Sequence, residues 1–239
     1  MRIVVWNCSM SLRKKLDAVL RLSPDIAVIG NAEFPDRLYP RDGGIRISGS
    51  LWFGTGRNCG LGVFSFGRWH IRPHSMHDPS ETAVVPLECS CGDVSLLLVA
   101  AQGVPARGRT GYGQPFDSFT TAQRYISSIQ GRPALFAGEL GAVSPGAWSG
   151  EGVEGGFYDL ERELAGQDLR SCYHSFTREP PGREKTPTFF EERDITRPAH
   201  TTWCFASTDL LLGLLDVQAG SPENWLDLGG HMPLVVDFA

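Results

Sequence analysis

The first thirty residues alternate two apolar runs with one helical pattern, and this order decides the fold class. Residues 2–6 form a short, β-branched apolar run that is typical of a buried strand. Residues 11–22 then repeat leucine and valine at helical spacing, and residues 25–29 form a second apolar run. A strand, a helix and a strand in succession predict an α/β fold.

The rest of the chain adds strand-like segments separated by glycine and proline. We expect a mostly antiparallel meander at 45–53, 60–66, 83–89 and 94–100, followed by strands at 133–137, 203–206, 210–217 and 233–238. A helix is predicted over 116–129. Residues 177–199 are polar and charged, which predicts a surface loop around a short strand at 188–190.

Length, composition and charge limit the classes of protein to consider. With 239 residues, of which 41% are hydrophobic, the chain suits a single domain over residues 1–239. A net charge of -5 argues against nucleic acid and anionic membranes as partners. The six cysteines follow no disulfide or zinc spacing, and no leader or membrane span is recognisable, so we expect a cytoplasmic protein with reduced thiols.

Six short segments carry a resemblance to a known family. They are Val5-Trp6-Asn7-Cys8, the run 24–29, Trp52-Phe53-Gly54 with the run 60–65, Ala137-Gly138-Glu139-Leu140-Gly141, the run 200–205 and the run 229–234. In order and approximate spacing, they resemble the endonuclease/exonuclease/phosphatase superfamily, and they extend over nearly the whole chain. The resemblance implies a four-layer α/β/β/α sandwich with two packed mixed β-sheets and an active site at one end of the sheets.

In that superfamily, a divalent metal and a carboxylate cluster polarise a phosphodiester and activate water. The resemblance places Asn7 at a retained asparagine that supports the metal or the phosphate. Asn31 stands at the position of the principal metal-binding glutamate. Glu139 replaces an aspartate and is one methylene longer, and the asparagine expected two residues later is Gly141.

The C-terminal positions have also lost their acids. His200 is kept, but Thr202 stands where the motif has an aspartate that orients the final histidine. His231 is that final histidine, and the acid beside it has become Gly230. Only Glu139 therefore remains a carboxylate among the four matched acid positions, which predicts no metal ligand set and no cofactor.

These replacements predict a degenerate site with a new purpose. We expect His231 and Glu139 as proton-transfer groups, in a pocket lined by Trp6, Asn7, Asn31, Tyr112, His200, Thr202, Trp203 and Gly230. Two versions remain open, which are metal-free acid/base chemistry on a small molecule and binding of a small-molecule ligand or protein partner. Convergence of His231 and Glu139 in a closed cavity would favour the enzyme, and an open groove would favour binding.

The alternative hypothesis is a surviving phosphodiesterase or nuclease that depends on Mg²⁺ or Mn²⁺. It would use Glu33, Glu139 and Asp227 as displaced ligands. Cys8 lies next to Asn7, but nothing in the sequence fixes a base beside it, so we interpret it as a buried, inert thiol.

Overall fold

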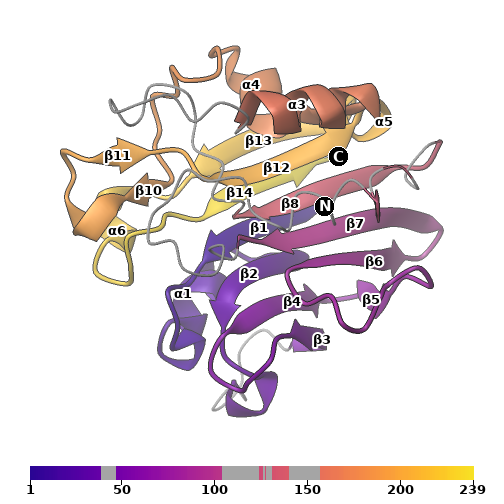
Figure 1. Ribbon diagram of the computed structural model, residues 1–239, viewed down its shortest axis with the longest axis horizontal. Helices are drawn as coiled ribbons and strands as arrows, with labels where there is room; N and C mark the ends of the chain where they lie inside the picture. Colours follow the sequence, from indigo (N-terminus) through magenta and orange to yellow (C-terminus); the bar gives the residue numbers. More distant parts are fainter. Residues whose placement is uncertain (39–46, 104–123, 126, 128–130, 140–156) are drawn as a thin grey trace.

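A computed structural model describes residues 1–38, 47–103, 124–125, 127, 131–139 and 157–239, and it contains two six-stranded sheets (Figure 1). The first sheet has the strand order β13-β14-β1-β2-β4-β3. Its strands are β1 (Arg2–Asn7), β2 (Ile26–Ala32), β3 (Ile47–Phe53), β4 (Gly60–Phe66), β13 (Leu214–Ala219) and β14 (Leu234–Phe238).

The second sheet has the order β5-β6-β7-β8-β12-β9. Its strands are β5 (His70–Pro73), β6 (Val84–Cys91), β7 (Val94–Gln102), β8 (Ala134–Glu139), β9 (Leu169–Ser171) and β12 (Thr202–Ser207). A separate pair joins β10 (Phe189–Phe190) to β11 (Pro198–Ala199). Both six-stranded sheets are mixed, because β1 runs parallel to β2 and β7 runs parallel to β8, whereas their other pairings are antiparallel.

Helices cover the outer faces of the two sheets. Leu16 and Val19 of α1 (Leu16–Arg21) pack on the outer face of the first sheet, and Leu160 and Leu164 of α3 (Phe157–Gly166) pack on the outer face of the second. A third apolar cluster fills the space between the sheets, with Val5 and Leu98 among its members. The predicted four-layer sandwich is therefore confirmed (Figure 1).

The chain differs from the sequence prediction in several helical segments. The helix predicted at 11–22 is split into a 3-10 turn (Leu12–Lys14) and α1. The strand predicted at 210–217 is a short helix, α5 (Thr208–Leu211), followed by β13, because a short apolar run has the same pattern in either state. Of the helix predicted at 116–129, Arg124 and Tyr125 are helical, and most of the rest lies outside the described residues.

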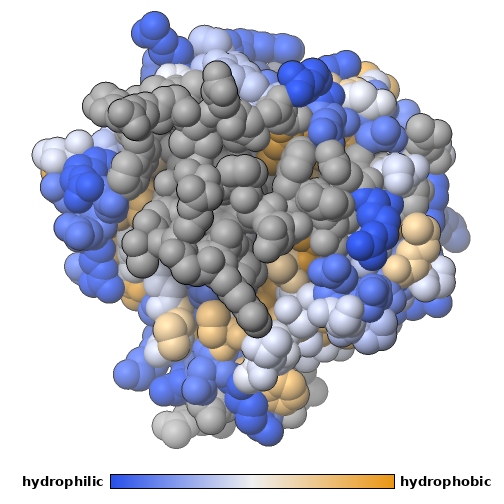
Figure 2. Space-filling view, in the orientation of Figure 1, coloured by the Kyte–Doolittle hydropathy of each residue, from blue (hydrophilic) through white to orange (hydrophobic). Residues whose placement is uncertain are grey.

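Further short elements complete the chain. They are α4 (Cys172–Thr177), α6 (Pro222–Trp225) and the 3-10 turns Pro35–Arg37 and Glu191–Arg193. Among the described residues, no helix combines the length and the hydrophobicity needed to cross a membrane. On the face shown in Figure 2, most of the described surface is hydrophilic. The apolar residues are buried between the two sheets and beneath the helices that cover their outer faces.

Candidate functional site

Polar side chains meet where the apolar core between the sheets ends. Asn7 and Gly30 are register partners on β1 and β2. On the facing sheet, Glu139 of β8 lies between its register partners Gln102 of β7 and Thr202 of β12. Strand alternation directs all five positions toward the other sheet, because each continues the series of residues that fills the core between the sheets.

Hydrogen bonds join these side chains into one chain of amides that ends on a carboxylate. The backbone N–H of Asn31 donates to Gln102 Oε1 at 2.7 Å, and Asn31 Nδ2 donates to Asn7 Oδ1 at 2.9 Å. Asn7 Nδ2 then donates to Glu139 Oε2 at 3.2 Å, and Ser9 N donates to Asn7 Oδ1 at 3.0 Å. Asn7 is thus both a local turn residue and the link between the sheets. We name this set, Asn7, Asn31, Gln102 and Glu139, the amide–carboxylate chain.

The backbone of Asn31 is shaped for this arrangement. Its φ of 53° lies in the left-handed region, which asparagine adopts more readily than most residues, and β2 shifts register against β4 between Ile29 and Ala32. Two thiols contact the same residue, since Cys8 Sγ donates to Asn31 O at 3.2 Å and Cys59 Sγ to Asn31 Oδ1 at 3.0 Å. Burial raises the pKa of Cys8 to about 12, which fits an inert thiol.

The amide–carboxylate chain is almost closed to solvent. Glu139 is 4% exposed, and Asn7 and Thr202 are also buried. Gly138 lets β8 approach β7 here, because a Cβ at that position would lie 1.9 Å from Ala101 O. Thr202 Oγ1 has no hydrogen-bond partner among the described residues, so it remains available next to Glu139.

The two predicted pocket tryptophans lie on other faces of the sheets. Strand alternation turns Trp6 away from Asn7, onto the outer face of the first sheet, where it packs against Trp225 at 5.0 Å. Trp203 likewise faces away from Thr202, toward the cluster under α3. The structure therefore places polar groups, rather than the two indoles, around Glu139.

Gly230 and His231 lie against the β10 strand. A Cβ at Gly230 would lie 2.7 Å from Phe190 O, so the backbone leaves no room for an acidic side chain here. The His231 ring packs on Phe189 at 4.4 Å, and its carbonyl oxygen accepts from Trp6 Nε1 at 2.9 Å. Burial lowers the pKa of His231 to about 3, so the imidazole is neutral at neutral pH.

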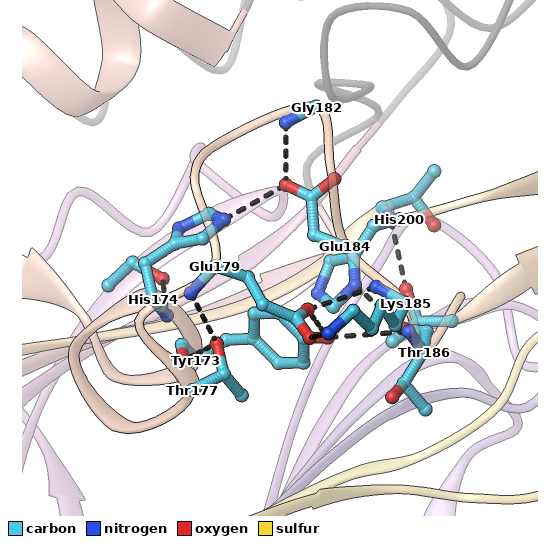
Figure 3. A network of polar contacts seen from close by, with 12 residues as sticks. Tyr173, His174, Thr177, Glu179, Gly182, Glu184, Lys185, Thr186 and His200 are labelled. Atoms are coloured by element: carbon cyan, nitrogen blue, oxygen red, sulfur yellow. Dashed lines mark hydrogen bonds and ion pairs between the residues drawn. The ribbon is translucent and has the colours of Figure 1, made fainter.

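His200 belongs to a second network, drawn in Figure 3. Its Nδ1 lies 3.1 Å from Thr186 O, and its ring packs on Tyr173 and Trp203 at 4.7 and 4.4 Å. Burial lowers the pKa of His200 to about 4. Asn7 donates directly to Glu139 and Asn31 donates to Asn7, whereas His200 contacts Thr186 and the His231 ring packs on Phe189.

The displaced acids of the alternative hypothesis are engaged elsewhere or exposed. Glu33 is buried and accepts from the backbone N–H of Arg13 at 2.7 Å and from its guanidinium. Asp227 is exposed, and Tyr112 lies outside the described residues. A magnesium ion needs several oxygen ligands, but the amide–carboxylate chain offers one carboxylate, and its amide oxygens already accept from N–H or S–H groups. The described residues contain no cluster of three His, Cys, Asp or Glu that could hold a metal ion.

Sequence reasoning missed Gln102 and Cys59. Leu96, Leu98 and Ala100 alternate along the strand, and the next residue in this series is Gln102. Extending the predicted strand by two residues would have placed Gln102 beside Glu139. Cys59 precedes β4 in a turn, where the sequence has no comparable period.

Comparison with known proteins gives a consistent picture of the fold. No protein-family model and no curated protein sequence matches the chain. Among solved structures, the endonuclease domain of TRAS1, a telomere-specific non-LTR retrotransposon, is 17% identical with a TM-score of 0.65, over 99% of this chain and 97% of that one. The 3' phosphatase NExo from Neisseria, bound to product DNA hairpin, is 16% identical with a TM-score of 0.65, over 100% and 99%.

An AP endonuclease from Archaeoglobus fulgidus is 13% identical with a TM-score of 0.68, over 100% of this chain and 99% of that one. At these identities, the shared property is the arrangement of the strands and helices. The chain has the fold of the endonuclease/exonuclease/phosphatase superfamily.

Proposed function

We propose that the chain is a catalytically degenerate homologue of this superfamily, and that the end of its sheets binds a small molecule or a partner without divalent-metal chemistry. The observation that supports this proposal most directly is the hydrogen bond from Asn7 Nδ2 to Glu139 Oε2. An amide N–H stabilises the carboxylate, in the part of the fold where the resemblance would put a cation.

The state of the histidines favours binding over acid/base catalysis. A general acid or base works best with a pKa near the working pH, and burial takes the pKa of His231 to about 3. The His231 ring packs on Phe189, and its carbonyl oxygen binds Trp6. Glu139, Gln102 and the Thr202 hydroxyl supply polar contacts of the kind that orient a bound ligand.

An activity assay separates this proposal from the metal-dependent alternative. Purified protein is incubated with bis(4-nitrophenyl) phosphate and Mg²⁺ or Mn²⁺, with and without EDTA, beside Glu139→Gln. We expect no EDTA-sensitive hydrolysis above the level of the Glu139→Gln variant. EDTA-sensitive hydrolysis that disappears in Glu139→Gln would instead support a phosphodiesterase with displaced ligands.

A further inference from the structure

A groove with an excess of positive charge lies at the edge of the second sheet, apart from the amide–carboxylate chain. It has a volume of about 520 Å³ and is bounded by α3, the edge strand β9 and α4. Three arginines and one glutamate line it, namely Arg162, Arg170, Arg178 and Glu161. This local excess of cations contrasts with the net charge of -5 of the whole chain.

The three arginines come from three different segments of the chain that line the groove. Arg162 is part of α3, and Arg170 is held in β9 by its pairing with Ala206 of β12. Arg178 follows α4 with a left-handed φ of 62°, and its N–H donates to His174 O at 3.0 Å. Arg162 and Arg170 therefore stand on regular elements, and Arg178 stands directly after one.

Two of the guanidinium groups form no close ion pair, although the Asp168 carboxylate lies near enough to Arg170 to interact with it electrostatically. No ion pair within 4 Å is found for Arg170 or Arg178 among the residues that the structure describes, whereas Arg2, Arg13 and Arg197 all pair with acids. Guanidinium groups bind phosphate oxygens through paired N–H donors. Tyr158 lines the same groove and is 55% exposed, and an aromatic ring can stack on a planar base.

We propose that this groove binds the phosphate groups of a nucleoside diphosphate, with the base against Tyr158. Its volume is in the range of small-molecule sites, about 300–1,000 Å³. The Arg170 and Arg178 guanidiniums bind the two phosphates, and Glu161, which lines the same groove, can accept hydrogen bonds from the sugar or the base. The inference does not rest on the proposed function, because the two sites share no residue.

Calorimetric titration with ADP, pyrophosphate and adenosine, in the presence of EDTA, tests the inference. We expect saturable binding of ADP and of pyrophosphate, and none of adenosine. Replacing both Arg170 and Arg178 by alanine should weaken both anions about tenfold or more. Tyr158→Ala should weaken ADP but not pyrophosphate. Arg68→Ala, which removes an exposed arginine near β5, should leave both affinities unchanged.

The same titrations can overturn the inference. It is wrong if neither ADP nor pyrophosphate binds the native chain, or if both bind the Arg170/Arg178 double variant with unchanged affinity. A single-stranded oligonucleotide that binds through these arginines, without competition from ADP, would also overturn it in favour of nucleic acid. Matching thermal unfolding curves for the variants establish that the fold is intact, and the phosphodiesterase assay stays independent of all these outcomes.

Discussion

The carboxamide of Asn7 provides the hydrogen bond that joins the two sheets within the candidate site. Its oxygen accepts from Asn31 of the first sheet and from Ser9, which follows β1. Its nitrogen donates to Glu139 of the second sheet. A carboxamide can play both parts because it carries an acceptor and two donors on one rigid plane. A carboxylate at the same position would have only acceptors.

Asn7→Asp should therefore destabilise the fold by about 3 kcal/mol at pH 7, because it buries a second negative charge beside Glu139. The repulsion raises the folded-state pKa of the pair, so the folded protein holds an extra proton. The stability lost at pH 7 is regained as the pH falls toward the unfolded pKa of about 4.

Urea denaturation at pH 7 and pH 5 measures this effect, with Asn7→Ala as the control. The alanine variant loses the same donor but adds no charge. The difference between the two variants should shrink at the lower pH. A constant difference would show that Asn7 and Glu139 are not neighbours in the folded protein.

Substitution of two glycines near the site should change the stability of the fold by different amounts. At Gly230, a Cβ would lie 2.7 Å from Phe190 O, so we expect Gly230→Ala to cost about 2 kcal/mol and Gly230→Asp at least as much. At Gly30, the nearest atom is 3.7 Å away, and Gly30→Ala should change stability by less than about 1 kcal/mol. Thermal unfolding of the three variants measures both effects, and equal losses would contradict the described packing.

Strand periodicity explains which elements could be predicted. The strands at Arg2–Asn7, Ile26–Ala32 and Gly60–Phe66 are buried on both faces or nearly so, and their continuous apolar runs marked them to within a few residues. The helices α3 and α4 were not predicted. α3 has ten residues with Leu160 and Leu164 at helical spacing, so its period was present in the sequence and was overlooked. α4 carries its buried residues in one turn, which is too little for a helical period to show.

The site was predictable in its membership more than in its geometry. Asn7, Asn31, Glu139 and Thr202 were recognised from the family resemblance, and the structure brings them together. The two tryptophans were assigned to the pocket because they adjoin Asn7 and Thr202, although neighbours along a strand face opposite ways. The split of the histidines between two networks depends on contacts with residues 173–190, which local patterns do not encode.

At the level of elements, the pair of His174 and Glu184 ties residues 178–187 to α4 (Figure 3). Both side chains are at least nine-tenths buried, they lie 2.9 Å apart, and Gly182 N also donates to Glu184 at 3.0 Å. Glu184→Ala should cost about 3 kcal/mol, because it removes one member of a buried pair.

Limited trypsin digestion reads out the local effect, since Arg183 and Lys185 are exposed cleavage points beside Glu184. We expect faster cleavage there in Glu184→Ala, detected by mass spectrometry of the peptides, and no change in Glu192→Ala, whose side chain is 82% exposed. Equal cleavage rates in Glu184→Ala and the native chain would mean that the pair does not hold the segment.

For the whole molecule, two buried neutral histidines predict a loss of stability in acid. Burial lowers the pKa of His200 to about 4 and of His231 to about 3. Both values lie below the unfolded value of about 6.5, so their contribution is complete above that pH and is lost as the pH falls. Between pH 7 and pH 5, each should cost about 2 kcal/mol.

Urea denaturation across this pH range checks the prediction in the native chain, in His200→Gln and in His70→Gln. His200→Gln should show a flatter dependence than the native chain. His70 is exposed, and its replacement should leave the slope unchanged. A native chain whose stability does not change between pH 7 and pH 5 would contradict the burial of both imidazoles.

For the whole molecule, the proposed function requires that the end of the sheets binds no divalent metal. Titration with Mn²⁺ followed by electron paramagnetic resonance tests this most directly, because free Mn²⁺ loses its signal on binding. We expect equal free Mn²⁺ in the native chain and in Glu139→Gln at every concentration. A saturable loss of signal in the native chain that is absent from Glu139→Gln would contradict it.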